Sequence, residues 1–188
     1  MLGIDKKVKV VTGCRPDDIP ADVLASKKPL VLKGLVANWP VTQAGLISAQ
    51  KGSDYLAQFY QNKPVTVAYG EPDINGRVFY NDDFTGFNYQ SQHLNLKTVL
   101  DKIHQHSEDI NPPVIYMAST LVERWLPGLR NENDITIPHA QPVVSIWLGN
   151  RSRIPAHYDL PDNIACSVVG RRRFTLFPPD QLANLYPG

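Results

Sequence analysis

The sequence predicts an α+β fold, in which helices and a few strands come first and closely spaced antiparallel strands follow. Two observations support this class. Helical spacing of apolar residues is concentrated before residue 105, whereas short β-rich runs separated by glycine and proline turns dominate from Pro142 onward. The 16 prolines and 12 glycines suit many short strands joined by turns rather than a helical bundle. We therefore expect a mainly β core of the jelly-roll type, a double-stranded β-helix.

The first 140 residues predict the N-terminal α/β portion of a single domain that spans residues 1–188. Helices are expected over 17–25, 52–61 and 96–103, and the last of these places Leu96, Val99 and Leu100 on one face. Asn75-Gly76 is a strong turn signal. The β-rich runs predict strands over 8–12, 29–36, 65–69, 78–80 and 114–117.

Residues 141–188 predict the first core strands of the jelly roll. Strands are expected over 143–148, 155–159, 163–169 and 172–177, followed by a short helix over 181–185. In the 163–169 strand, the face that carries Asn163 is small and partly polar, which suits a pocket lining. The opposite face, which carries Cys166, is apolar and suits packing against a core.

Composition excludes several classes of protein. Hydrophobic residues make up 43% and charged residues 20% of the chain, and the net charge of +1 gives no general attraction to nucleic acid or anionic membranes. No apolar run approaches the length of a membrane span, and the first residues lack the apolar stretch of a signal peptide. Cys14 and Cys166 stand far apart in no metal or redox spacing, so we expect two free thiols and a cytoplasmic protein.

The triplet His157-Tyr158-Asp159 indicates a chemistry. In an extended strand, residues i and i+2 point to the same side, so His157 and Asp159 are expected to present an imidazole and a carboxylate together. These are two of the three ligands of the 2-His-1-carboxylate facial triad of non-haem Fe(II) oxygenases. The second histidine of such a triad normally lies on a later strand. The chain ends at Gly188, so we expect a domain that lacks its C-terminal part.

Arg172 is a candidate for binding an anion. It shares a strand face with Phe174 and Leu176, where a guanidinium is costly unless an anion meets it. Its planar fork binds carboxylates with two parallel hydrogen bonds. The neighbouring Arg171 and Arg173 fall on the opposite face and are expected to be solvated. Arg172 is therefore predicted to hold a carboxylate ligand inside the barrel.

Several runs of residues together resemble a known family. They are Trp147-Leu-Gly-Asn150, Pro155-Ala-His-Tyr-Asp159, Asn163 and Gly170-Arg-Arg-Arg-Phe-Thr-Leu-Phe-Pro-Pro-Asp180. This combination resembles the cupin-like JmjC group of Fe(II)/2-oxoglutarate oxygenases, which includes the asparaginyl hydroxylase of hypoxia-inducible factor. The resemblance is dense over 143–188 and looser over 15–120, where the β-rich run before Trp39-Pro40 also fits.

The resemblance implies roles for five residues. His157 and Asp159 would bind Fe(II). Arg172 falls where the family has a lysine for the distal carboxylate of the co-substrate 2-oxoglutarate, and Tyr116 where it has a tyrosine bonding the same carboxylate. Asn163 falls where an asparagine lines the co-substrate site. The implied activity is hydroxylation with Fe(II) as cofactor and 2-oxoglutarate as co-substrate.

Two departures from the family pattern leave alternatives open. Ile154 replaces a threonine that often helps to hold 2-oxoglutarate, and the second iron-binding histidine has no counterpart. His139, just before the β-dense region, is the best substitute within the chain. The chain is thus a hydroxylase-type domain in a shortened form, a non-catalytic cupin-fold binding module, or a cupin metalloenzyme such as an isomerase.

Expectations about partners are limited. The substrate, a protein or a small molecule, cannot be read from one sequence, and the near-neutral charge disfavours nucleic acid. A jelly roll without its closing strands would present unpaired strand edges, which pair readily with another chain. We therefore expect a homodimer or a larger assembly through exposed sheet edges.

Overall fold

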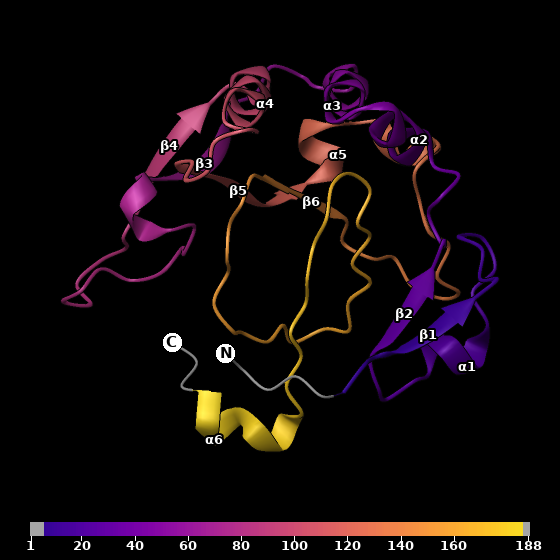
Figure 1. Cartoon of the computed structure of the whole chain (residues 1–188). Helices are drawn as coiled ribbons and strands as arrows, with labels where there is room; N and C mark the ends of the chain where they lie inside the picture. Colours follow the sequence, from indigo (N-terminus) through magenta and orange to yellow (C-terminus); the bar gives the residue numbers. More distant parts are fainter. Residues whose placement is uncertain (1–5, 186–188) are drawn as a thin grey trace.

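The computed structural model describes residues 6–185 as helices and two separate sheets (Figure 1). The strands are β1 (Lys9–Thr12), β2 (Leu30–Lys33), β3 (Val65–Gly70), β4 (Gln90–Leu94), β5 (Val114–Leu121) and β6 (Ser145–Gly149). The α-helices are α1 (Ala21–Leu24), α2 (Pro40–Ile47), α3 (Ala49–Ala57), α4 (Leu96–Gln105), α5 (Val122–Trp125) and α6 (Leu182–Leu185). Short 3-10 turns are η1 (Pro72–Ile74), η2 (Leu129–Asn131) and η3 (Pro179–Gln181). Over this part of the chain, every helix is too short or too polar to cross a lipid bilayer.

The main sheet has four antiparallel strands in the order β4-β3-β5-β6. The register aligns one residue from each strand in a single row across the sheet: Ser91, Ala68, Tyr116 and Gly149. Paired residues share a face, so the side chains of Ser91, Ala68 and Tyr116 lie on the same side of the sheet. Gly149 leaves the corresponding position on β6 without a side chain. A register shift between Met117 and Thr120 then bends β5 beyond the row.

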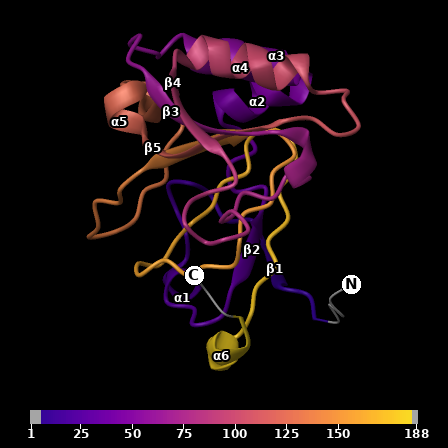
Figure 2. The same ribbon diagram turned by 90° about the vertical axis from the view of Figure 1, so that its left-hand side faces the viewer.

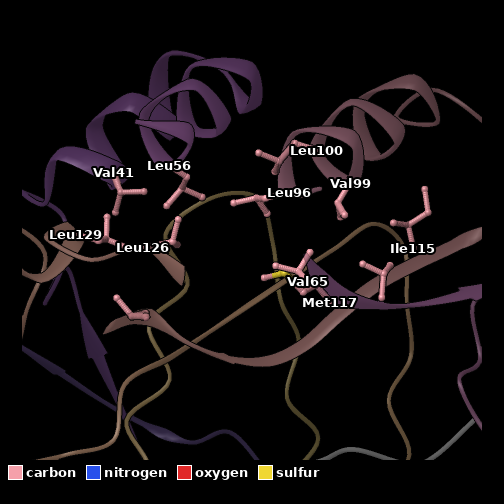
Figure 3. Packing of buried hydrophobic residues seen from close by; sticks show 12 residues of the cluster. Val41, Leu56, Val65, Leu96, Val99, Leu100, Ile115, Met117, Leu126 and Leu129 are labelled. Atoms are coloured by element: carbon pink, nitrogen blue, oxygen red, sulfur yellow. The ribbon is translucent and has the colours of Figure 1, made fainter. Parts of the chain in front are cut away.

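Helices α2, α3 and α4 cover the other face of this sheet (Figures 1 and 3). The amphipathic pattern of α4 produces this packing, because Leu96, Val99 and Leu100 are all buried. The Asn95 side chain caps the helix by accepting a hydrogen bond from the Lys97 amide. The buried cluster contains Val41, Leu56, Val65, Val67, Leu96, Val99, Leu100, Ile115, Met117, Val122, Leu126 and Leu129.

A second, smaller core lies beside the parallel pair β1 and β2. Its buried residues are Ile19, Leu35 and Val36. Cys166 and Val168 pack partly buried against it, although they are distant in sequence. Both cysteines are free thiols, as the sequence predicts. The predicted apolar face of the 163–169 segment is therefore confirmed at these two positions.

The first half of the chain agrees well with the sequence predictions. The expected helices near residues 21, 52 and 96 form, as do the strands near 9, 30, 65 and 114. Asn75 and Gly76 take positive φ angles of 50° and 78°, which fits the predicted turn. Helix α2, helix α5 and strand β4 were not predicted. The strand predicted over 78–80 is wrong, because this segment makes only an isolated bridge between Tyr80 and Phe87.

Strand predictions after β6 are also wrong. The segments 155–159, 163–169 and 172–177 contain no strand. Within residues 6–185, no backbone hydrogen bond between peptide groups involves residues 154–177. A β-strand exists only when a neighbour pairs with its peptide groups, so β propensity alone does not form one. We call residues 154–177 the tail segment; it runs on the side of the sheet opposite the helices, between the sheet and α6 (Figures 1 and 2).

The combination of helices with an antiparallel sheet agrees with the predicted α+β class. The jelly roll that lacks its C-terminal part and the division at residue 140 stay predictions.

Candidate functional site

A cavity of about 400 Å³ lies on the face of the main sheet that the helices leave open. Strands β3, β4 and β5 contribute Thr66, Ala68, Ser91 and Tyr116 to its wall. These residues alternate with the buried core positions Val67, Ile115 and Met117, as the period of two in a strand requires. The remaining lining residues are Val65, Val78, Tyr89, Ala118, Ser119, Thr120, Leu121, Arg124 and Trp125.

Tyr116 has small neighbours on both sides in the sheet. It pairs with Ala68 on β3 and with Gly149 on β6. A Cβ atom added at Gly149 would lie 3.2 Å from Cδ2 of Tyr116 and 3.0 Å from the carbonyl oxygen of Ile115. Gly149 thus leaves the space that the phenol ring occupies.

The side chain of Asn150 fixes the end of β6 against β5. Its Oδ1 accepts a hydrogen bond from the Ile115 amide at 3.1 Å, and its Nδ2 donates to the Pro113 carbonyl at 2.7 Å. The Asn150 amide itself donates to the Ile115 carbonyl at 3.2 Å. Three hydrogen bonds therefore set the position of β5 next to Tyr116.

Tyr116 and Arg172 interact electrostatically, although they are distant in sequence. Burial raises the pKa of the Tyr116 phenol, and the positive charge of Arg172 acts on the same pKa in the opposite, lowering direction. Because burial dominates, the phenol stays protonated at neutral pH and can donate a hydrogen bond. Arg172 itself is exposed, and its guanidinium lies 6.0 Å from the centroid of Phe174. A phenol donor and a guanidinium on one open face are suited to a carboxylate.

His157 and Asp159 lie in the exposed tail segment, each with a hydrogen-bonding partner. Nδ1 of His157 is 2.9 Å from the carbonyl oxygen of Pro155. A carbonyl only accepts, so Nδ1 carries the proton and Nε2 is the free lone pair, the arrangement found in metal-binding histidines. Asp159 accepts a 2.7 Å hydrogen bond from Nδ2 of Asn163. Since 155–159 is not a strand, the alternation argument for a shared face does not apply.

The donor types of His157 and Asp159 fit Fe(II), but the set is incomplete in the described chain. Over residues 6–185, no three His, Cys, Asp or Glu side chains gather as a possible metal-binding group. His139 sits in an exposed turn with a φ of 60° and does not complete the pair. Asn163 bonds Asp159 and is not part of the cavity wall beside Tyr116.

Among the cavity residues the sequence singled out Tyr116 alone, and Arg124 and Tyr89 are two that it did not indicate. Arg124 lines the cavity, with its guanidinium 4.5 Å from the centroid of the Trp125 ring, and Tyr89 forms another part of the wall. Arg124 comes from α5, a four-residue helix too short to show periodicity. Tyr89 immediately precedes the polar edge strand β4, whose sequence Gln-Ser-Gln-His-Leu carries little β signal.

Comparison with known proteins identifies the family. The model of the cupin-like domain family matches residues 16–188. JmjC domain-containing protein D of Dictyostelium discoideum is 24% identical over 213 aligned residues, which cover 100% of this chain and 43% of that protein. Lysine-specific demethylase 8 of Danio rerio is 27% identical, covering 89% of this chain and 39% of the relative. Jumonji C domain-containing protein 5 of Drosophila melanogaster is 23% identical, with 85% and 38% covered.

The antiparallel main sheet leaves one face free of helices, and the wall of the cavity lies on that face (Figure 1). The chain belongs to the cupin-like domain family, and the relatives that match it include proteins named for the JmjC domain. The resemblance read from residues 143–188 is thereby confirmed. The chain spans about two-fifths of the length of the curated relatives it matches.

Proposed function

We propose that this chain is the co-substrate-binding portion of an Fe(II)/2-oxoglutarate-dependent oxygenase of the hydroxylase type. The observations that support this most are the position of Tyr116 in the wall of the cavity and the electrostatic effect of Arg172 on its half-buried phenol. The two residues come from distant parts of the sequence, and each was assigned from the sequence to the same carboxylate. A metal isomerase of the cupin fold has no need of such a pair.

Tyr116 and Arg172 would hold the distal carboxylate of 2-oxoglutarate. The raised pKa of Tyr116 keeps its hydroxyl a donor, and Arg172 supplies a charge-assisted fork. The small side chains of Ala68 and Ser91 in the same row leave room beside the phenol. Asn163 would act indirectly, by orienting Asp159 through its amide.

His157 and Asp159 would supply two of the protein ligands of Fe(II). Nε2 of His157 is free because Nδ1 donates to Pro155, and the Asn163 amide holds one oxygen of Asp159. Bound Fe(II), with 2-oxoglutarate as the reducing co-substrate, would activate dioxygen, the oxidant: one oxygen atom would enter a C–H bond of the substrate, and the other would enter the succinate formed with carbon dioxide from 2-oxoglutarate. In this proposal, residues 141–188 belong to a jelly roll, and a third protein ligand completes the Fe(II) site. The free thiols of Cys14 and Cys166 accord with a cytoplasmic location.

The test is an anaerobic titration of the full chain with Fe(II) and 2-oxoglutarate, followed by the visible charge-transfer band of the chelate. We expect a saturable band that His157→Ala removes. We expect Arg172→Ala to weaken 2-oxoglutarate binding by at least about tenfold, the effect of losing one charge-assisted pair. Arg173→Ala is the matched control, since it removes the same charge from the adjacent exposed position.

Each outcome separates the candidates. Equal losses of 2-oxoglutarate affinity in Arg172→Ala and Arg173→Ala would show that Arg172 contributes only its positive charge, and this would contradict the proposal. Fe(II) that binds in calorimetry but gives no band when 2-oxoglutarate is added, together with no binding of 2-oxoglutarate, would favour a cupin metalloenzyme that does not use 2-oxoglutarate. The absence of any band, with 2-oxoglutarate still bound in calorimetry, would favour a non-catalytic binding module.

A further inference from the structure

The loop between η1 and β4 exposes large aromatic side chains to solvent. Phe84 is 70% and Phe87 is 58% exposed, although both are among the most apolar side chains of the loop. Groups of exposed aromatic residues are uncommon on monomeric proteins and mark sites of interaction. We call residues 77–89 the aromatic loop; it projects to one side of the molecule next to β4 (Figure 1).

The rings of the aromatic loop form a continuous stack that reaches the cavity. Tyr80 and Phe87 stack with centroids 5.5 Å apart, and Phe87 and Tyr89 stack at 5.0 Å. Phe84 extends the stack outward at 6.0 Å from Tyr80. Tyr89 also lines the cavity beside Tyr116. The exposed surface is therefore continuous with the wall of the candidate site.

Hydrogen bonds hold the aromatic loop in one shape. Asn88 accepts from the Phe79 amide at 2.9 Å and donates to the Arg77 carbonyl at 2.8 Å. Asn81 accepts from the Gly86 amide at 3.1 Å, and the Asn81 amide donates to the Gly86 carbonyl at 3.0 Å. A surface whose rings are already ordered loses little conformational entropy when a partner binds.

The charge of this region selects the kind of partner. Residues 71–89 contain four carboxylates and one guanidinium, a net charge of −3 in a chain whose total is +1. The guanidinium of Arg77 lies 4.3 Å from the centroid of Phe79, so a ring of this loop already receives a cation on its face. Asp82 and Asp83 flank the exposed Phe84 and remain in solvent. Acidic surroundings repel phosphate groups and anionic lipids, whereas they attract cationic peptides.

We propose that the aromatic loop is a docking surface for a polypeptide segment that carries arginine or lysine side chains. The cationic groups lie over the face of Phe84 at the end of the stack and beside the Asp82 carboxylate, Phe87 supports these rings, and the stack directs the segment toward the cavity. That this segment is the substrate of the oxygenase rests on the proposed function. The docking itself does not rest on the proposed function, because it uses none of the residues assigned to iron or 2-oxoglutarate.

The experiment measures peptide binding without iron or 2-oxoglutarate. Three labelled peptides of equal length, glycine-serine repeats carrying arginine, glutamate or glutamine at the same positions, are titrated with the full chain by fluorescence anisotropy. We expect the arginine peptide alone to bind, and the double variant Phe84→Ala/Phe87→Ala to bind it at least about tenfold less tightly. The matched control is Leu46→Ala/Ile47→Ala, which removes two side chains that are 72% and 76% exposed on α2.

Several results would overturn the docking proposal. They are equal binding of the three peptides, no binding of the arginine peptide, or equal losses in the two double variants. Circular dichroism of both variants separates lost binding from lost folding. A failed peptide titration with an intact charge-transfer band would reject the docking surface and leave the oxygenase proposal standing; the reverse pattern would reject only the latter.

Discussion

Gly149 keeps space for the phenol ring of Tyr116, because a Cβ atom at this position would make tight contacts with Cδ2 of Tyr116 and with the Ile115 carbonyl oxygen. Gly149→Ala is expected to destabilise the protein by about 1–3 kcal/mol, the usual cost of overpacking. Urea denaturation measures this change. Gly86→Ala is the control, since its added Cβ would meet only Nδ2 of Asn81 at 3.7 Å; we expect a change below about 1 kcal/mol. Similar losses in both variants would show that the space beside Tyr116 is not limiting.

Cys166 gives the stability a dependence on alkaline pH. Burial raises the pKa of its thiol from 9.0 to about 11. The folded state holds this proton more tightly than the unfolded state, so its contribution to stability is complete below pH 9. It is lost as the pH rises from about 9 to about 11.

Urea denaturation between pH 8 and 11 measures this effect in wild type and in Cys166→Ala. The variant is expected to lack the component of the alkaline loss that the wild type shows, whereas Cys14→Ala is expected to keep it. An identical pH profile for the wild type and both variants would contradict a buried, protonated Cys166.

The assignment of Tyr116 and Arg172 to one carboxylate stays a prediction; the charge of Arg172 acts on the Tyr116 phenol, which agrees with it. Asn163 was expected in the pocket, yet its amide bonds Asp159. One-dimensional spacing fixes which residues share a strand face only if the strand forms, and here 155–159 does not.

At the level of elements, helical periodicity was the more dependable signal. Helix α4 buries Leu96, Val99 and Leu100 as its pattern requires, because a helix satisfies its own backbone hydrogen bonds. Strands depend on a partner, and the β-rich tail segment has none within residues 6–185. Helix α2 escaped prediction because Trp39-Pro40 reads equally as the end of a strand and as a helix start with proline at its first position.

The contact between helices α2 and α3 and the tail segment makes a testable prediction. A Cβ added at Gly45 would lie 2.6 Å from Cγ2 of Val169 and 3.1 Å from the Val168 carbonyl oxygen. Gly45→Ala should therefore destabilise the protein, although alanine by itself favours a helix by up to about 1 kcal/mol. In the background of Val169→Ala, which removes Cγ2, the same substitution should cost at least about 1 kcal/mol less.

A double-mutant cycle by urea denaturation measures this coupling. Gly86→Ala combined with Val169→Ala serves as the control pair, because their effects should add. If Gly45→Ala and Val169→Ala also add, the tail segment does not lie against α2 in solution.

At the scale of the whole molecule, the chain exposes more surface than its mass requires. The accessible area is 13,619 Å², whereas a compact monomer of 21.0 kDa exposes about 9,000 Å². The difference of about 4,600 Å² exceeds the surface area that one partner buries in a protein–protein interface of standard size. Exposed apolar side chains of the tail segment contribute to this area: Leu160 is 94% exposed, and Tyr158, Phe174 and Leu176 are also exposed.

We propose that the isolated chain associates with itself through this surface and the free edge of β6. Sedimentation velocity at increasing concentration is expected to show a dimer or larger species, and Leu160→Lys with Phe174→Lys should shift it toward monomer. The Leu46→Lys/Ile47→Lys variant, with equal added charge on α2, should not. A single monomeric species at all concentrations would contradict the proposal.

The weak attachment of the tail segment has a consequence for ligand binding. Tyr116 belongs to the densely packed sheet, whereas Arg172 belongs to a segment without a backbone ladder among the described residues. A carboxylate that joins them would act as a cross-link between a rigid half and a loosely held half of the chain. The measured affinity of the protein for this carboxylate would then combine two equilibria: the docking of the tail segment onto the sheet, and the binding of the carboxylate to Tyr116 and Arg172. Substitutions that favour docking, far from the carboxylate, would tighten binding without touching the ligand.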